Sequence, residues 1–209
     1  MRIKILLLAA VAGALLLGLA CQEETLNQPF SQADWTREGW KLWKVGNYED
    51  AETAFGNALK VDPYYAEAYG GLGWTFIRMQ NQEDAVNQFE NGILVGEQAG
   101  TSLFTRQILY MGAAVAYEAT DEYTLSAEKG RYMANNLLTH EFNFYDHTVT
   151  TYDLYIILSL DYYGLADSTN CVWAINKMRA AVGEQPNYHF TTWEDATREI
   201  ERLVGKDPS

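Results

Sequence analysis

The chain has 209 residues, a formal net charge of −13, 48% hydrophobic and 13% aromatic residues, and only 4 prolines. This composition excludes a disordered or linker-dominated chain, and the length suffices for one compact domain or a short solenoid. The acidity argues against nucleic acid and anionic lipid headgroups as partners, because like charges repel.

Residues 1–20 have the three parts of an export signal. Arg2 and Lys4 precede an apolar stretch, residues 5–17, which is short for a membrane-spanning helix. Small residues and then Cys21 follow this stretch. We therefore expect an exported protein whose mature part begins near Cys21.

The segment from Leu17 to Cys21 resembles a bacterial lipobox, in which the cysteine is acylated after cleavage. Gly18 and Leu19 depart from the usual order of that motif, so cleavage by the general signal peptidase is the alternative. The resemblance implies lipidation of Cys21 and membrane attachment through that lipid. Gln22, where retained lipoproteins carry aspartate, favours the outer membrane, with the periplasmic or surface side left open. Residues 21–32 are then a lipidated linker.

Residues 33–100 repeat themselves at an offset of 34, which is typical of a solenoid of helix pairs. The eight identities are Gly39/Gly73, Trp40/Trp74, Asn47/Asn81, Glu49/Glu83, Asp50/Asp84, Ala51/Ala85, Phe55/Phe89 and Asn57/Asn91. Asn47 and Asn81 are expected N-caps of the second helix of each pair. The glycines lie in the apolar stripe of each first helix, where they indicate close approach of a neighbouring helix.

These residues resemble the tetratricopeptide-repeat family, with Trp35, Gly39, Ala51, Phe55 and Pro63 at the family's spacing. The resemblance implies an all-α fold: a short right-handed solenoid of about three to four helix pairs with a C-terminal capping helix. It also implies a protein or peptide partner, bound on a concave face lined by the first helices.

Residues 101–183 carry few of the family's residues, and we expect degenerate helix pairs there. Apolar periodicity predicts helices over residues 102–119, 125–138, 150–163 and 168–182. Cys171 lies in an apolar stretch of the last of these, and it has no intramolecular partner once Cys21 is acylated, so we expect a buried, inert thiol. Residues 184–209 are a loop and a capping helix that begins with a capping box of Thr191 and Glu194 and runs to Val204.

Few side chains suggest chemistry. His140, Glu141, Asp146 and His147 have the types but not the spacing of a zinc site, and the aromatic residues among them, Phe144 included, favour a loop that packs on the core. No phosphate loop, nucleophile motif or cofactor motif is present in the sequence. We therefore expect no enzyme activity, no metal and no cofactor, with a hydrolase that uses scattered carboxylates as a remote alternative.

A second stripe on the first helices offers candidate binding residues. At positions that face the concave groove in the family lie Trp40, Trp43, Lys44, Trp74 and Arg78, with Arg106 further along. Such an aromatic groove suits an extended peptide or a glycan, provided that Trp40 and Trp74 are partly exposed. The alternative is that the tryptophans pack beneath neighbouring helices. The expected function is a protein-binding scaffold of the bacterial envelope, and a lipoprotein that captures a glycan or small ligand is the rival.

Overall fold

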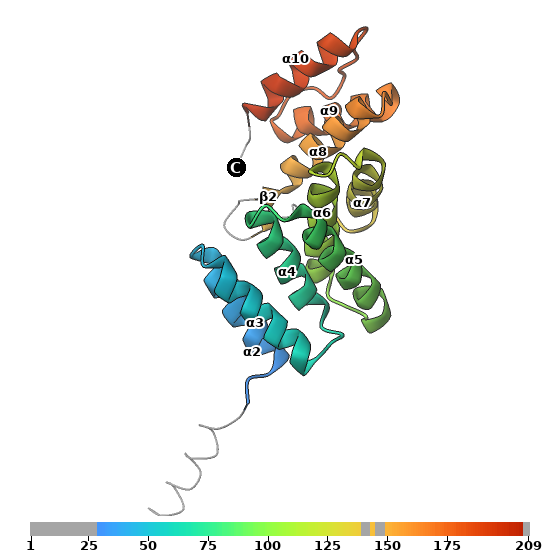
Figure 1. The fold of residues 1–209 in the computed structure, drawn as a ribbon. Helices are drawn as coiled ribbons and strands as arrows, with labels where there is room; N and C mark the ends of the chain where they lie inside the picture. Colours follow the sequence, from blue (N-terminus) through green and yellow to red (C-terminus); the bar gives the residue numbers. More distant parts are fainter. Residues whose placement is uncertain (1–28, 139–142, 145–148, 207–209) are drawn as a thin grey trace, which may run out of the picture. The chain divides into compact units, whose positions relative to one another are not determined.

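The computed structural model describes residues 29–138, 143–144 and 149–206, and within them the chain is all-α apart from two short strands (Figure 1). The expected signal peptide, Cys21 and most of the linker lie outside these residues. The elements are α2 (Gln32–Lys44), α3 (Tyr48–Val61), α4 (Ala66–Arg78), α5 (Gln82–Ala99), α6 (Leu103–Glu118), α7 (Tyr123–Asn136), β1 (Asn143–Phe144), β2 (Val149–Thr150), α8 (Thr151–Gly164), α9 (Ser168–Ala181) and α10 (Trp193–Val204). The prediction of sequential helix pairs with a final helix is confirmed.

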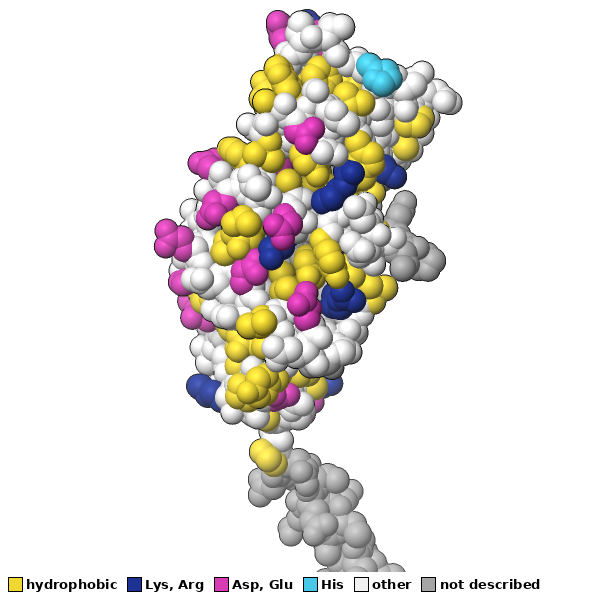
Figure 2. All heavy atoms as spheres, turned by 90° about the vertical axis from the view of Figure 1, so that its right-hand side faces the viewer, with side chains coloured by type: hydrophobic (Ala, Val, Ile, Leu, Met, Phe, Trp, Pro, Cys, Tyr) yellow, Lys and Arg dark blue, Asp and Glu magenta, His cyan; other side chains and the backbone are white. Residues whose placement is uncertain are grey.

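The helices pack as the pairs α2–α3, α4–α5, α6–α7 and α8–α9, and each pair contacts the next. The first helices α2, α4, α6 and α8 also contact one another in sequence, so they form one layer, which we call the inner layer. The second helices pack mainly against the inner layer. Figure 2 views the side of α5 and α7, where hydrophobic side chains lie in separate patches between acidic and basic ones.

Two buried phenylalanines join successive inner helices, and both are 0% exposed. A Cβ atom built on Gly39 or Gly71 would lie 2.7 or 2.3 Å from the ring of Phe55. Phe89 has the same relation to two later glycines, Gly73 at 2.6 Å and Gly112 at 2.2 Å. Each ring therefore packs against two inner helices at once, in space that any side chain larger than that of glycine would fill.

The turns between the two helices of all four pairs share one backbone conformation. A residue of positive φ precedes the second helix: Gly46, Gln80, Asp121 and Ala166. The next amide, of residue 47, 81, 122 or 167, donates to a carbonyl five residues earlier, at 2.9 to 3.0 Å. This is the hydrogen bond that ends a helix in a Schellman turn. The third and fourth pairs thus keep the turn geometry of the first two pairs, although they carry few of the repeat's characteristic residues.

Asn47 and Asn81 lie at the predicted N-cap positions, but neither side chain bonds to the helix backbone. Instead each amide donates to the carboxylate three residues later, Asp50 at 2.7 Å and Asp84 at 2.6 Å. The predicted capping box at Thr191 and Glu194 is displaced by one residue, because Thr192 and Asp195 form it.

The strands β1 and β2 pair antiparallel, with Phe144 opposite Val149. β2 leads directly into α8, whose first turn is held by a capping box of Thr150 and Asp153. Phe144 is 0% exposed, so the expectation that this loop packs on the core is confirmed for that residue.

Within the described residues, no helix is both long and apolar enough to span a membrane.

Candidate protein-binding face

The inner layer brings Trp40 and Trp43 of α2 together with Trp74 of α4, as the sequence predicts. Their exposed fractions, however, are only 4%, 6% and 3%. The prediction that Trp40 and Trp74 are partly exposed is therefore wrong. The physical reason is packing against other rings: Phe144 of β1 contacts all three indoles, Phe55 contacts Trp40, and Phe89 contacts Trp74.

The four rings form one cluster. Phe144 stacks on Trp74, with centroids 4.8 Å apart and planes inclined by 28°. It meets Trp40 and Trp43 edge to face, at 5.5 and 5.9 Å. These are favoured geometries for aromatic pairs, each worth about 0.5–1.5 kcal/mol beyond the buried area.

Hydrogen bonds to neighbouring inner helices orient two of the indoles. Trp40 Nε1 donates to Glu67 Oε1 of α4 at 3.1 Å. Trp74 Nε1 donates to the carbonyl oxygen of Ile108 of α6 at 3.2 Å. Each tryptophan therefore joins its own helix to the next inner helix.

An open pocket of about 350 Å³ adjoins this cluster on α2. It is lined by Ala33, Thr36, Arg37, Trp40, Lys41, Lys44, Tyr65 and Glu67, and we call it the α2 pocket. Two of the predicted binding residues, Trp40 and Lys44, lie in it. The stripe i, i+4, i+7, i+8 and i+11 that begins at Ala33 is the sequence signal that would have added Arg37 and Lys41.

The α2 pocket is basic and aromatic on a strongly acidic chain. Arg37 pairs with Asp34 at 2.8 Å, and Lys41 pairs with Glu38 at 3.0 Å. The two basic side chains are 65% and 66% exposed. Ion pairs that exposed contribute about 0–1 kcal/mol, so both cations can turn to a bound anion at little cost.

Glu67 holds the opposite wall of the α2 pocket. Its carboxylate accepts hydrogen bonds from Trp40 Nε1 and, at 3.5 Å, from the hydroxyl of Tyr65. Burial, followed by the charge of Glu67, raises the pKa of Tyr65, which keeps its hydroxyl protonated.

The two predicted arginines, Arg78 and Arg106, also lie apart from the α2 pocket. The Arg78 guanidinium lies over the Trp43 ring, 5.2 Å from its centroid, and so borders the tryptophan cluster. Arg106 turns toward α7 and donates to the Tyr132 hydroxyl at 2.9 Å. The structure therefore does not bring Arg106 to the same site.

Comparison with known proteins agrees with this geometry. Residues 36–101 match the family model described as tetratricopeptide repeat. The helix pairs of this segment therefore resemble tetratricopeptide repeats. A solved structure described as the crystal structure of MamA shares the fold, with a TM-score of 0.53, 18% identity, and coverage of 81% of this chain and 94% of that chain. No curated protein matches the chain.

A tetratricopeptide-repeat domain suggests a scaffold for protein–protein interaction, and the family is typically non-enzymatic.

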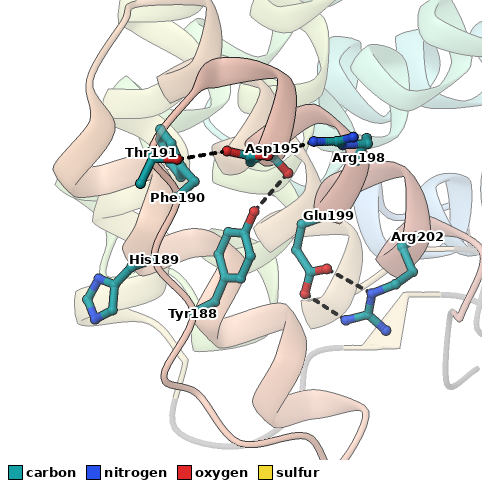
Figure 3. Close-up of a pocket in the computed structure, with 8 residues that line it drawn as sticks. All are labelled: Tyr188, His189, Phe190, Thr191, Asp195, Arg198, Glu199 and Arg202. Atoms are coloured by element: carbon teal, nitrogen blue, oxygen red, sulfur yellow. Dashed lines mark hydrogen bonds and ion pairs between the residues drawn. The ribbon is translucent and has the colours of Figure 1, made fainter.

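A second pocket, of about 360 Å³, lies beside α10 (Figure 3). Its lining comprises Tyr188, His189, Phe190, Thr191, Asp195, Arg198, Glu199 and Arg202.

Most polar groups of that second pocket already stabilise the C-terminal helix. Asp195 caps α10, and its backbone carbonyl accepts from the Tyr188 hydroxyl at 2.7 Å. Glu199 binds Arg202 of the same helix (Figure 3). It also binds Arg179 of α9. This network attaches α10 to the last repeat-like pair, which is a structural role, so the α2 pocket is the better candidate site.

The remaining candidates are accounted for separately. Cys171 is buried as predicted, and burial raises the pKa of its thiol to about 11, which keeps the thiol unreactive. The cluster of His140, Glu141, Asp146 and His147 lies outside the described residues. Among the residues that are described, no three His, Cys, Asp or Glu side chains gather as metal ligands would.

Proposed function

We propose that this protein is a scaffold that binds an extended segment of a partner protein on its inner layer, at the α2 pocket. The single observation that carries the proposal is that pocket itself: an open, basic and aromatic depression on the first helix of a tetratricopeptide-repeat array.

The pocket's chemistry favours a peptide segment that carries acidic side chains. Lys41 and Arg37 offer exposed cations within one turn of Trp40, and the half-buried ring of Tyr65 supplies an aromatic wall. Charge attraction would steer an acidic segment to this site, away from the negative potential of the rest of the chain.

The burial of the tryptophans weakens the rival proposal of a glycan-capture protein. A sugar ring stacks on the face of an exposed aromatic side chain, whereas Trp40 and Trp74 are 4% and 3% exposed. A peptide needs only backbone contacts, charge complementarity and one or two anchor side chains.

We further propose that the scaffold acts at the bacterial envelope, attached through a lipid on Cys21. The support is the order of basic residues, apolar stretch and Cys21 in the sequence. Lipid attachment would leave the helical array free to engage a partner near the membrane.

Reversal of charge in the α2 pocket tests the proposal. We expect Lys41→Glu to reduce recovery of the partner at least tenfold when the protein is purified from its own cells after cross-linking. Lys60→Glu is the matched control, because it makes the same charge change on an exposed residue of α3, in the second-helix layer. Equal recovery with both variants would contradict binding at the α2 pocket.

A further inference from the structure

A third open pocket, of about 410 Å³, lies on the second-helix layer. Residues of α5, α6 and α7 line it, and we call it the α5–α7 groove: Glu90, Ile93, Leu94, Glu97, Tyr110, Glu128, Lys129 and Tyr132. It shares no lining residue with the α2 pocket. Figure 2 views this side of the molecule, where acidic side chains lie beside hydrophobic ones.

Two stacked tyrosines give the α5–α7 groove a rigid aromatic wall. Tyr110 of α6 and Tyr132 of α7 have ring centroids 4.5 Å apart and planes inclined by 19°. Tyr110 is 6% exposed, whereas Tyr132 is half-buried. Arg106 donates to the Tyr132 hydroxyl at 2.9 Å, and the Tyr110 hydroxyl donates to Glu97 at 3.0 Å, so both rings are fixed at their polar ends. Leu94, 59% exposed, adds an apolar edge.

The charge of the α5–α7 groove is negative. Three carboxylates and one ammonium group line it, which gives a net charge of −2. Glu90 is already satisfied, because it pairs with Lys129 at 2.7 Å and accepts from the Tyr117 hydroxyl at 3.0 Å. Glu97 and Glu128 are exposed, and neither forms an ion pair within the part of the chain that the structure describes. Two negative charges are therefore open to a ligand.

The position of Glu97 is unfavourable for the helix that carries it. Glu97 lies in the last turn of α5, and that turn contains no basic residue. The C-terminal end of a helix carries a partial negative charge, which favours cations and disfavours carboxylates there. A residue placed against a local preference of this kind indicates a functional role. A cation bound beside Glu97 would be stabilised by the carboxylate and by the helix end together.

We propose that the α5–α7 groove binds an arginine side chain from a basic segment of a partner protein. A guanidinium is planar, stacks on aromatic rings and pairs with carboxylates through two parallel hydrogen bonds, and the groove offers both kinds of surface. The chain already uses the stacking contact elsewhere, since the Arg131 guanidinium lies 3.7 Å from the centroid of the Trp173 ring.

This inference goes beyond the proposed function. The α2 pocket would hold an acidic segment on the inner layer, and the α5–α7 groove would hold a basic segment on the second-helix layer. The scaffold would then join two segments of opposite charge. Because the two sites share no residue, either assignment can fail without the other.

The test uses a short, blocked, fluorescent peptide in which arginine and glycine alternate. The control peptide has citrulline, which is neutral and of nearly the same shape, in place of arginine. Fluorescence anisotropy at physiological salt measures the binding of both to the purified protein. The groove variant carries Glu97→Gln and Glu128→Gln, and the new amide at position 97 still accepts from Tyr110. The matched control carries Glu49→Gln and Glu201→Gln, which remove the same two charges from exposed positions on α3 and α10.

We expect the arginine peptide to bind wild type about tenfold more tightly than the citrulline peptide does. The groove variant should lose about tenfold in affinity for the arginine peptide, and the matched control should stay within about twofold of wild type. Equal losses in the two variants would mean that the acidic chain attracts cations without a specific site. Equal affinity for the two peptides, or no binding of the arginine peptide, would also contradict the proposal.

Discussion

The carboxyl Oδ2 atom of Asp161 lies 2.7 Å from the Oγ atom of Ser126, in the contact between α8 and α7. The same Ser126 Oγ lies 2.9 Å from the carbonyl oxygen of Ala114 on α6. A serine hydroxyl has one hydrogen and cannot donate it to both oxygens. A protonated Asp161 resolves the conflict, because it donates to Ser126, which then donates to Ala114.

Asp161 therefore predicts a pH dependence of stability. Burial chiefly, with a smaller contribution from the charge of Glu118, raises the pKa of Asp161 to about 7. The unfolded chain has a pKa near 3.9, so the folded state holds the extra proton between about pH 4 and pH 7. This contribution to stability is complete below about pH 4 and is lost as the pH rises through about 7.

Asp161→Asn should abolish this dependence, because the amide stays neutral. We expect the free energy of unfolding of wild type, relative to that variant, to fall between pH 5 and pH 7 by up to about 1.4 kcal/mol per pH unit. Urea denaturation followed by circular dichroism at several pH values measures the difference. Parallel curves for the two proteins would mean that Asp161 is charged in the fold.

The two inter-helix phenylalanines should be the largest single contributors to the repeats. Phe55→Ala and Phe89→Ala should each cost about 3–5 kcal/mol, because both rings are fully buried between two helices. Tyr64→Ala, whose side chain is 68% exposed, should stay within about 0.5 kcal/mol. A cost under about 1 kcal/mol for either phenylalanine would disprove its place at that contact.

Gly112 and Gly56 give a more stringent test, because a side chain added at Gly112 would clash and one added at Gly56 would not. A Cβ at Gly112 would lie 2.2 Å from the Phe89 ring, whereas a Cβ at Gly56 meets nothing within 4 Å. We expect Gly112→Ala to cost about 1–3 kcal/mol through overpacking. Gly56→Ala should instead gain about 0.5–1 kcal/mol from helix propensity. Thermal unfolding of both variants checks the opposite signs.

Most of the fold could be predicted from the sequence. The 34-residue offset located the first two pairs, and apolar periodicity placed the helices of the third and fourth pairs to within two residues. The degenerate pairs are hard to assign to the family because they carry few of its residues, although their turns keep the positive φ at Asp121 and Ala166. The backbone tolerates these residues in the left-handed region, so the turn persists after its sequence signature has gone.

The site could be predicted only in part, because its decisive contact is long-range. The tryptophan stripe was visible in the sequence, but nothing local indicates that Phe144 covers it. The C-terminal capping box shows a different limit: Thr191 and Thr192 each precede an acidic residue by three positions, so the pattern fits both. Geometry alone selects Thr192.

Attachment through lipid is a separate prediction, tested on the whole chain in cells. Cys21→Ser should move the protein from the membrane fraction to the soluble fraction and abolish its labelling by a fatty-acid analogue. Cys171→Ser is the control and should keep both properties. Membrane retention without any label on the native protein would contradict lipidation.

Binding through the inner layer is tested most directly by site-specific photo-cross-linking in the cells that make this protein. A photoreactive amino acid is placed at Lys41 in the α2 pocket and, in a second strain, at Lys60 on α3. We predict that position 41 yields a discrete cross-linked partner and that position 60 yields none. Cross-linking of the same partner at position 60 alone, or at neither position, would contradict a binding site on the inner layer.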